Sequence, residues 1–336
     1  MSLLSMFNRI INPGLVDKDS TEPMHVVTPL TTGTMMYPMD PCRKTLVMSI
    51  MNTTPDSFSD GESNTLDPLS LRETAAAHIA AGATIIDVGG QSSRPNAPDV
   101  TAEEEINRVL PAIAAIKSLP EAEGIAISVD TYRAAVAEAA VNAGAHIIND
   151  ISAGALDPQM LSTVARLGCT YIMMHMRGTP ATMQSPENCT YDNLRRDIAR
   201  ELEGRIALAN KAGVRNWRII LDPGIGFAKT QAQNLSLLRL PFLPKNSAFN
   251  YRNATPDEKY LARIPQLVGC SRKGFIGNIT GVAEPKDRIF GTATAVTASI
   301  QGGADIVRVH DVQEMVQVAR MADAIYRFSV KASLST

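Results

Sequence analysis

The sequence contains few cysteines, and their spacing fits no metal site. Its four cysteines, Cys42, Cys169, Cys189 and Cys270, form no C-x-x-C or C-x-x-H pair, which excludes a zinc site of the usual spacing. We expect all four to be free thiols in a reducing compartment. Cys270 lies in an apolar run, so we expect it to pack in the core.

An excess of charge of one sign is also missing. The 32 Lys and Arg residues are balanced by 34 Asp and Glu residues, for a net charge of −2. This balance indicates neither a nucleic-acid surface nor a membrane surface, and the apolar runs are too short to span a bilayer. The sequence also lacks a G-x-x-x-x-G-K-S/T loop and a G-x-S-x-G turn, so P-loop and nucleophile-elbow enzymes are excluded.

Residues 1–43 are the least organised part of the chain. Apolar residues at helical spacing predict a short amphipathic helix: Leu3, Leu4, Phe7, Ile10 and Ile11. The first acidic residue is Asp17, which is typical of a transit peptide. A linker or a docking arm is the alternative interpretation. The stretch that follows is rich in Thr, Pro and Met and has no regular period.

From Thr45 onward, short apolar runs alternate with longer stretches of helical period. The predicted strands are Leu46–Met51, Thr84–Val88, Ile125–Val129, His146–Asn149, Thr170–Met174, Arg218–Leu221, Gln266–Gly269 and Asp305–Val309. The predicted helices lie near 67–82, 101–117, 132–143, 157–167, 190–212, 231–239, 286–302 and 311–328. Glycines expected as left-handed helix caps are Gly82, Gly144, Gly168 and Gly213.

This alternation predicts a parallel sheet, because each crossover helix returns the chain in the same direction. Eight units favour a closed (β/α)8 TIM barrel over an open sheet. We therefore expect an N-terminal arm at residues 1–43 and one α/β barrel domain at 44–330. The stretch 240–260 is expected to be a surface insertion.

Every predicted strand ends in groups that can bind or react, whereas the strand starts are bland. In a barrel of this kind the chemistry lies at the carboxyl ends of the strands. One set of amide and cationic groups suits a phosphate or pyrophosphate: Asn52, Arg94, Arg308 and His310. A second set suits a flat heterocycle with several N–H donors and ring acceptors: Asp130, Asn149, Asp222 and Lys273.

The longest polar stretch after a strand is Met51–Gly61, M-N-T-T-P-D-S-F-S-D-G. Its residues favour turns, and Phe58 is a lone aromatic among them. This composition indicates a functional loop at the end of the sheet. The alternative is an ordinary surface loop with Phe58 packed on the core.

Simpler structural roles compete with some of these assignments. Asp130 could only cap the helix that follows it, and Lys273 could lie in a solvated turn. Structural roles are expected for five others, with Asp150 and Asp311 as caps or supports of the site, His175 as a hydrogen-bonded core histidine, and His78 and His146 as core residues.

Eight motifs in this order resemble dihydropteroate synthase over roughly residues 44–328: N-T-T-P-D-S-F-S-D-G, G-G-Q-S-S-R-P, S-V-D-T, I-I-N-D, M-H-M-R-G-T-P, L-D-P-G-I-G-F, S-R-K-G and R-V-H-D-V. The resemblance implies a (β/α)8 barrel that condenses 6-hydroxymethyl-7,8-dihydropterin pyrophosphate with p-aminobenzoate. The products are 7,8-dihydropteroate and pyrophosphate. The implied reaction runs through pyrophosphate loss to a pterin cation, which the aniline nitrogen attacks.

The resemblance also implies roles for matching residues. The catalytic residues would be Lys273, Asp130 and Asp222. The pterin would contact Asp130, Asn149, Met174, Asp222, Gly226, Phe227 and Lys273. The pyrophosphate would contact Asn52, Arg94, Arg308 and His310, with Mg²⁺ as the cofactor and Asn52 as its ligand. The p-aminobenzoate would contact Phe58, Ser93, Pro95, Lys273 and Gly274.

Two positions depart from the family pattern. Ser93 stands where many members have Thr, and Gly274 stands where many have Ser. Both would touch p-aminobenzoate, and thus sulfonamides that mimic it. The resemblance also implies a homodimer and a fungal-type arrangement, in which the enzyme is the last domain of a longer folate-synthesis polypeptide. We expect a cytoplasmic protein, with mitochondria as the alternative.

Two other interpretations fit the pterin residues. A methyltetrahydrofolate methyltransferase would share the carboxylates but lack the S-F-S-D-G and S-R-P loops that this chain contains. A non-catalytic pterin-binding module would have no need of the phosphate set together with Lys273. The sequence therefore favours the synthase.

Overall fold

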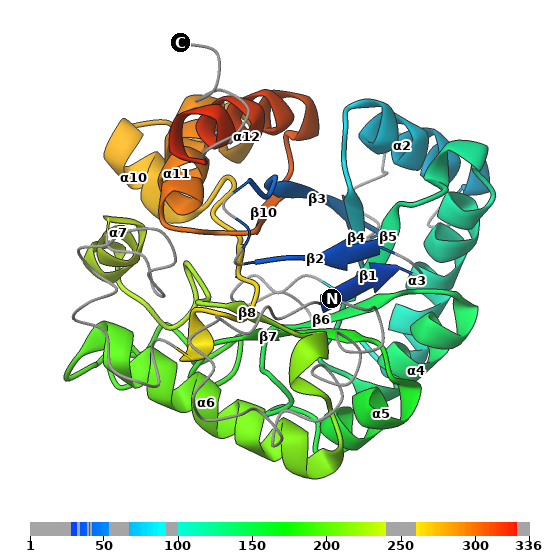
Figure 1. Cartoon of the computed structure of the whole chain (residues 1–336), viewed down its shortest axis with the longest axis horizontal. Coiled ribbons are helices and arrows are strands. Elements are labelled where there is room, and N and C mark those ends of the chain that lie inside the picture. Colours follow the sequence, from blue (N-terminus) through cyan, green and yellow to red (C-terminus); the bar gives the residue numbers. More distant parts are fainter. Residues whose placement is uncertain are drawn as a thin grey trace, which may run out of the picture.

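The computed structural model describes residues 28–31, 34–38, 40, 42–53, 67–91, 100–239 and 260–327. Its centre is a ring of parallel strands (Figure 1), which are β3 (Leu46–Asn52), β4 (Ile85–Gly89), β5 (Ala126–Asp130), β6 (Ile147–Asp150), β7 (Thr170–Met174), β8 (Ile219–Asp222), β9 (Leu267–Val268) and β10 (Ile306–Val309). The order in the sheet is β8-β7-β6-β5-β4-β3-β10-β9. A parallel bridge between Leu221 and Gln266 joins β8 to the start of β9. The predicted TIM barrel is confirmed.

Helices form the outer layer around this ring (Figure 1), namely α2 (Pro68–Ala80), α3 (Ala102–Lys117), α4 (Ala134–Ala143), α5 (Met160–Leu167), α6 (Leu194–Ala212), α7 (Gln231–Arg239), α10 (Gly274–Thr280), α11 (Ile289–Gln301) and α12 (Val312–Tyr326). Helix α3 begins where Thr101 accepts a hydrogen bond from the Glu104 amide, and three glutamates occupy its first turn. All four predicted cap glycines have positive φ. The sequence analysis did not predict α10, a helix of only seven residues.

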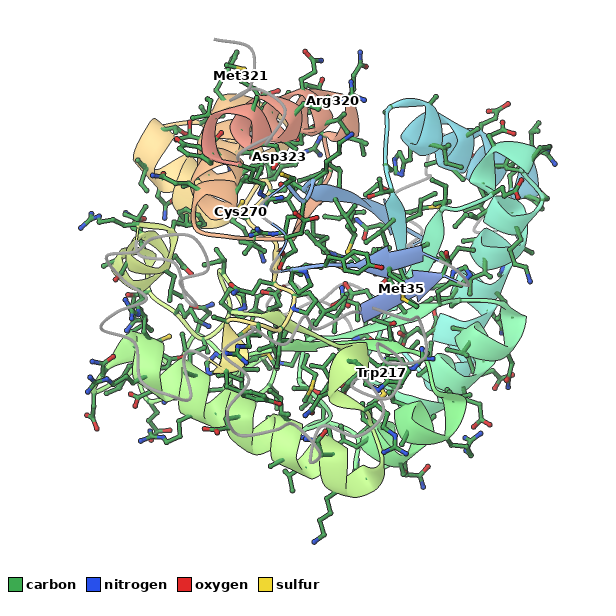
Figure 2. All side chains as sticks on the ribbon, viewed as in Figure 1. Met35, Trp217, Cys270, Arg320, Met321 and Asp323 are labelled. Carbon is green, nitrogen blue, oxygen red and sulfur yellow. The ribbon has the colours of Figure 1, made fainter. Side chains whose placement is uncertain are left out.

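Alternate residues of each strand face two different environments. Those that face outward, such as Val47, Ile86 and Val129, join the large core between sheet and helices. Those that face inward near the strand starts form a second apolar cluster: Met48, Ile85, Ala126, Ile147, Ile172, Ile220, Leu267 and Ile306. Because both faces are buried, the strands are nearly continuous apolar runs. Side chains fill the interior (Figure 2), so the barrel is a packed core rather than a pore.

A β-hairpin covers the amino-terminal end of the barrel. It consists of β1 (Thr28–Thr31) and β2 (Thr34–Met36), which pair antiparallel. Leu30 and Met36 are buried against the inner apolar cluster, whereas Met35 points away and is 46% exposed (Figure 2). The hairpin lies within the predicted N-terminal arm, in a stretch where the sequence showed no period. Leu30 and Met36 thus pack the hairpin against the inward apolar side chains at the strand starts.

Several predictions fall outside the described residues. These are the amphipathic helix near the N-terminus, the loop residues after Thr53 up to Gly61, and the insertion apart from Tyr260. Within the described part of the chain, no helix is both long and apolar enough to cross a bilayer.

Candidate active site

The polar side chains gather at the carboxyl end of the barrel because the strand register aligns them. Asn52 pairs with Gly89, Gly89 with Asp130, and Asp130 with Asn149. These residues therefore occupy one level across four neighbouring strands. A Cβ on Gly89 would lie 3.5 Å from Asn52 Oδ1 and 3.9 Å from Asp130 Cβ. The glycine leaves the space between an amide and a carboxylate open.

Arg308 joins two carboxylates in the centre of this end. Its Nε donates to Asp87 Oδ2 at 2.6 Å, and its Nη2 donates to Asp130 Oδ2 at 2.8 Å. Asn149 Nδ2 also donates to Asp87 Oδ2, at 3.0 Å. Arg308, which we predicted for pyrophosphate, thus lies in direct contact with Asp130, which we predicted for the heterocycle.

Asp87 is a site residue that the sequence analysis did not select. It is fully buried in β4, and its Oδ1 has no hydrogen-bond partner among the described residues. Asp87 faces inward two residues before Gly89, on the same face of the strand. The available signal was a carboxylate inside an otherwise apolar run, I-I-D-V-G, since buried charges need a partner or a function.

The electrostatics of Asp130 reflect a shortage of positive charge. Burial raises the pKa of Asp130 to about 7; the Arg308 charge opposes this shift, and the nearby Asp87 and Glu105 add to it. One guanidinium therefore serves two carboxylates, of which Asp87 is fully buried and Asp130 is partly buried. Asp130 does not cap α4, because the Ala134 amide at the start of that helix donates to Asp157 Oδ2 at 2.7 Å. The cap alternative is wrong.

Asp222 and Lys273 face the site from the other side of the ring. Asp222 ends β8, is 5% exposed, and accepts a hydrogen bond from the Gly224 amide at 2.7 Å. Burial raises its pKa to about 6. Lys273 Nζ lies 4.1 Å from the centroid of the Phe227 ring. Burial, together with the Arg308 charge, lowers the pKa of Lys273 to about 8. Lys273 is half-buried, and its contact with Phe227 favours a place in the site over the solvated-turn alternative.

Gly226 makes the contact between the loop after β8 and Lys273 possible. Its φ is +85°, and a Cβ there would lie 3.1 Å from Lys273 Cδ. An L-residue would therefore be both strained and crowded. The lysine lies across this glycine with its ammonium over an aromatic face, which is a favourable cation–π geometry.

An apolar cluster lines the strand ends on the side of β6, β7 and β8. It consists of Ile151, Met174, Met183, Phe227 and Ala228, with Tyr132 and Met176 packed against it. Met174 and Phe227 were predicted. Met183 was missed because it lies in a turn-rich segment with no period. Charged groups on one side and an apolar, polarisable surface on the other suit a flat polar heterocycle.

The remaining predicted residues are distributed as follows. The His310 ring Nδ1 lies 3.0 Å from Ser271 Oγ, which also accepts the His310 backbone N–H at 3.2 Å. Gly274 begins α10, and a Cβ there would meet no atom within 4 Å. Phe58, Ser93, Arg94 and Pro95 lie outside the described residues.

Four of the five residues expected to be structural have hydrogen-bond or ion-pair partners, whereas His78 Nδ1 has none among the described residues. Asp150 accepts hydrogen bonds from the Ser152 amide, the Ser152 hydroxyl, the Gly154 amide and the Tyr171 hydroxyl. His146 Nδ1 accepts from the Ile127 amide at 3.0 Å. Asp311 forms an ion pair with Arg272. His175 is 3% exposed and hydrogen-bonded at both ring nitrogens, as predicted.

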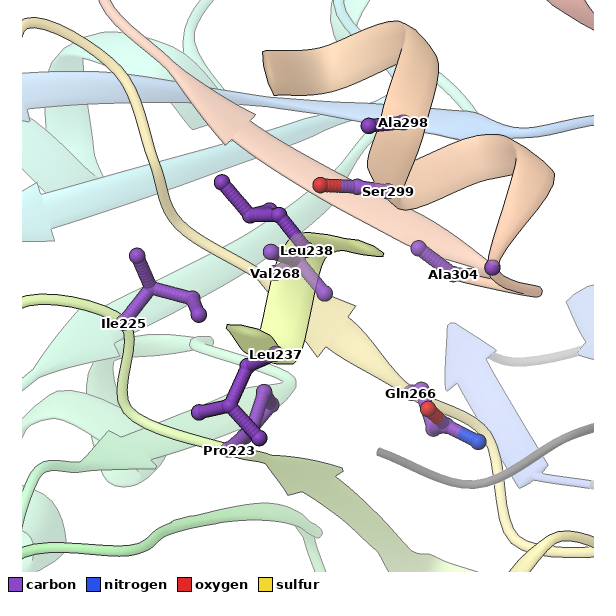
Figure 3. A pocket seen from close by; sticks show the side chains of 10 residues that line it. Pro223, Ile225, Leu237, Leu238, Gln266, Val268, Ala298, Ser299 and Ala304 are labelled. Carbon is purple, nitrogen blue, oxygen red and sulfur yellow. The ribbon is translucent and has the colours of Figure 1, made fainter. Parts of the chain in front are cut away.

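A separate hollow lies outside the strand ring, between β8, β9, α7 and α11 (Figure 3). Its walls are mostly apolar: Pro223, Ile225, Leu237, Leu238, Gln266, Val268, Ala298, Ser299, Gly302 and Ala304. It contains none of the predicted site residues and no charged side chain. We therefore place the chemistry at the strand ends and not in this hollow.

Comparison with known proteins points to one family. The family model described as Pterin binding enzyme matches residues 48–310. The chain is 44% identical over 307 residues to the mitochondrial folate synthesis bifunctional protein of Pisum sativum, covering 91% of this chain and 57% of that protein. It is 44% identical over 300 residues to the dihydropteroate synthase of Synechocystis, covering 89% of this chain and 96% of that enzyme.

A solved structure agrees with these relatives. The dihydropteroate synthase of Xanthomonas albilineans with 4-aminobenzoic acid superposes with a TM-score of 0.74 at 33% identity, covering 91% of this chain and 100% of that chain. This chain spans little more than half the length of the pea relative.

Proposed function

Since this chain belongs to the family of pterin-binding enzymes, we propose that it catalyses the dihydropteroate synthase reaction. The observation that carries the proposal is the meeting of two residue sets at one end of one barrel. The heterocycle set is Asp130, Asn149, Asp222 and Lys273, and the described members of the phosphate set are Asn52, Arg308 and His310. A molecule that is both a pterin and a pyrophosphate ester needs both sets.

The pterin ring is proposed to bind across Asp130, Asn149 and Asp222. Carboxylate and amide oxygens accept hydrogen bonds from the ring N–H groups, and the Asn149 amide can donate to a ring acceptor. Lys273 and Phe227 form the adjacent wall, with Gly226 and Met174 beside them. Because the carboxylates are buried, an analogue that lacks these N–H groups would leave them unpaired and should bind weakly.

The pyrophosphate is proposed to face the β10–β3 side of the barrel end. Arg308 and His310 come from β10 and the residue just after it, and Asn52 ends the neighbouring strand β3. Arg94 belongs to the same set by resemblance alone. As the bond between the pterin carbon and the pyrophosphate oxygen breaks, its electron pair leaves with the oxygen. Cationic groups stabilise that charge.

The donor set is compatible with the proposed Mg²⁺. Asn52 offers an amide oxygen beside the open space at Gly89. No group of three His, Cys, Asp or Glu side chains that could hold a metal occurs in the described part of the chain. This fits Mg²⁺, which is often held by one or two protein ligands and by substrate phosphates. Bound there, it would neutralise charge on the leaving pyrophosphate.

The resulting pterin cation is proposed to be stabilised by Asp130 and Asp222. The lone pair of the p-aminobenzoate nitrogen then forms the new bond to carbon, and the nitrogen loses a proton. No covalent enzyme intermediate is needed. Lys273 and Gly274 are proposed to lie against p-aminobenzoate, with Phe58, Ser93 and Pro95 from the loops that follow β3 and β4.

The wider context is also proposed from the relatives. The name of the pea protein supports a chain fused to another folate-synthesis domain. The same name supports the mitochondrial alternative over the cytoplasmic one. A homodimer stays a prediction from the resemblance, and sedimentation of the purified protein would test it.

The direct test is pyrophosphate release by the purified protein with pterin pyrophosphate and Mg²⁺, with and without p-aminobenzoate. We expect release coupled to dihydropteroate formation. Tight pterin binding without turnover would favour the binding-module interpretation. A second test separates the two, because p-aminobenzoate binding should require pyrophosphate and Mg²⁺ in the enzyme but not in a simple pterin binder.

A further inference from the structure

A buried lysine outside the proposed substrate contacts holds the loop after β8. Lys229 is 2% exposed. Its Nζ lies 3.0 Å from His175 Nδ1, 3.1 Å from the Gly224 carbonyl oxygen and 2.9 Å from the Phe227 carbonyl oxygen. Burial lowers the pKa of Lys229 to about 7. In its protonated form the ammonium has three protons, and here each has one acceptor. Two of the three acceptors belong to the backbone of the loop that carries Phe227.

The partner network fixes which ring nitrogen of His175 faces Lys229. Nε2 lies 3.0 Å from Glu201 Oε2, and Arg177 donates to both carboxylate oxygens of Glu201. A carboxylate can only accept, so Nε2 carries the proton and Nδ1 presents its lone pair to Lys229. Burial and the Lys229 charge lower the pKa of His175 to about 4, which keeps the ring neutral.

The loop after β8 has several residues with positive φ, an unfavourable backbone conformation that other contacts must hold in place. Gly224, Gly226 and Ala228 have φ values of +69°, +85° and +49°. The left-handed region costs an alanine about 1 kcal/mol or more. A Cβ on Gly224 would lie 2.1 Å from the His175 carbonyl oxygen, so the backbone passes very close to β7. The ammonium of Lys229 joins the two ends of the Gly224–Phe227 turn.

We propose, as an extension of the proposed function, that Lys229 is a positioning residue for pterin binding. The hydrogen bonds from Lys229 to the carbonyl oxygens of Gly224 and Phe227 fix the backbone of this turn. They thereby fix the position of the Phe227 ring beside the Lys273 ammonium. The Gly224 amide, held in the same turn, is the hydrogen-bond donor to Asp222. We call the three hydrogen bonds of Lys229 the brace. Loss of the brace would therefore disturb both the Phe227–Lys273 contact and the hydrogen bond to the Asp222 carboxylate.

Two substitutions of His175 distinguish the loss of the Lys229 hydrogen bond from the loss of packing around the imidazole ring. An asparagine places an amide oxygen near the position of Nδ1 and keeps an acceptor for Lys229. A glutamine reaches the position of Nε2, keeps the contact with Glu201 and removes that acceptor. Both shrink the same buried ring. His175→Asn should bind pterin pyrophosphate within about threefold of wild type, whereas His175→Gln should lose about tenfold, as for one unsatisfied buried group.

Lys229→Met, which removes all three donors, should weaken pterin pyrophosphate binding by about tenfold to a hundredfold. Binding is measured by calorimetry without p-aminobenzoate, so no turnover occurs. His146→Asn is the matched control, because His146 is a half-buried, hydrogen-bonded histidine at the amino-terminal end of the barrel. It should leave the affinity unchanged even where it lowers the melting temperature.

Hydrogen exchange of the ligand-free proteins gives a readout that does not depend on the proposed function. The amides of residues 224–228 should exchange at least about tenfold faster in Lys229→Met and His175→Gln than in wild type and His175→Asn. Equal exchange in all variants, or equal affinity losses for the two His175 variants, would overturn the proposal. If Lys229→Met does not fold, the His175 pair still decides. Wild-type protein that binds no pterin would instead refute the proposed function, while exchange still tests the brace.

Discussion

The two ends of the barrel are built from the same strands but differ in what their inward side chains do. At the amino-terminal end the inward residues are apolar, including Ile85 and Ile306, and Leu30 of the hairpin packs on them. Two residues further along the same strands, the inward positions are Asp87 and Arg308. The inward side chains therefore change from apolar to charged within about 7 Å, which is the length of two strand residues.

The ends also differ in how their buried carboxylates are paired. At the amino-terminal end, Asp305 accepts a hydrogen bond from Arg43 Nε and another from the Gln266 amide, each at 2.7 Å. At the carboxyl end Asp87 Oδ1 has no partner among the described residues, and the pKa values of Asp130 and Asp222 are raised by burial. Buried carboxylates with raised pKa values indicate where a ligand is expected, whereas a paired carboxylate such as Asp305 contributes to stability. The amino-terminal end is not fully satisfied either, because Arg43 Nη2 and Arg327 Nε have no partner among the described residues.

Replacing Lys273 tests the carboxyl end most severely. Lys273→Ala removes the cation over Phe227 and near Asp222, so turnover should fall by about a hundredfold to a thousandfold. The loss of hydration of Lys273 on folding offsets its favourable contacts in the site. The free energy of unfolding should therefore change by less than about 1 kcal/mol when the lysine is removed. Asp222→Asn should behave in the same way. Initial rates and urea unfolding measure both effects.

The control is Lys286→Ala, an exposed lysine in the short segment Pro285–Asp287. It should keep the wild-type rate. A Lys273→Ala enzyme that also runs at the wild-type rate would show that the site has been misplaced.

Truncating Ile85 tests the opposite end. Ile85 is fully buried in the inner apolar cluster, and Ile85→Ala should lower the free energy of unfolding by about 2–5 kcal/mol through lost transfer energy and a cavity. At a temperature where the variant is fully folded, the KM for pterin pyrophosphate should stay at the wild-type value. Ile279→Ala, at an exposed site, is the matched control. A tenfold rise in KM for Ile85→Ala would show that the two ends are coupled.

The barrel could be predicted because its signals are local. Short apolar runs recur eight times along the chain, the glycines expected as caps at the ends of four of the predicted helices all have positive φ, and polar residues mark the strand ends. The predicted strand bounds differ from those of the structure by at most one residue, and those of β7 are identical. The hairpin β1–β2 could not be predicted from local sequence. Leu30 and Met36 are buried against the inward apolar side chains at the strand starts, which come from distant parts of the chain.

Most polar side chains near the strand ends were found from the sequence, including Arg308 inside β10, but Asp87 was not. Asp130 and Asp222 end their strands, whereas Asp87 lies within a strand and looked like part of an apolar run. Lys229 was missed for a different reason, since a lysine after a glycine-rich turn usually lies in solvent. Its burial depends on His175, which is 54 residues away in the sequence.

The pH dependence should show function and stability moving in opposite directions. The pKa of Asp222 is raised from 3.8 to about 6 by burial. If its carboxylate binds the pterin N–H groups, affinity should fall as the pH drops below about 6, by up to about tenfold per pH unit. The folded state binds this proton more tightly than the unfolded state does. The contribution of Asp222 to stability should therefore be full below about pH 4 and be lost as the pH rises through 6.

Titration calorimetry and urea unfolding between pH 4 and 8 measure the two trends. The same series on Asp222→Asn is the control, because it keeps the titration of the ligand and of Asp130 but removes that of Asp222. Parallel slopes for wild type and variant would mean that Asp222 is not the group that titrates.

The smallest expected effect concerns Gly274, where the chain departs from the family pattern. A Cβ at this position has open space around it, and the residue is the first of α10, where a serine is compatible with a helix. Gly274→Ser should therefore fold normally and add a hydroxyl at the proposed p-aminobenzoate end of the site. One added hydrogen bond at a partly solvated position should lower the KM for p-aminobenzoate by about two- to tenfold. The KM for pterin pyrophosphate should not change, and Gly274→Ala separates the hydroxyl from the loss of backbone freedom. Equal gains for both variants would assign the effect to a stiffer helix start rather than to a new contact.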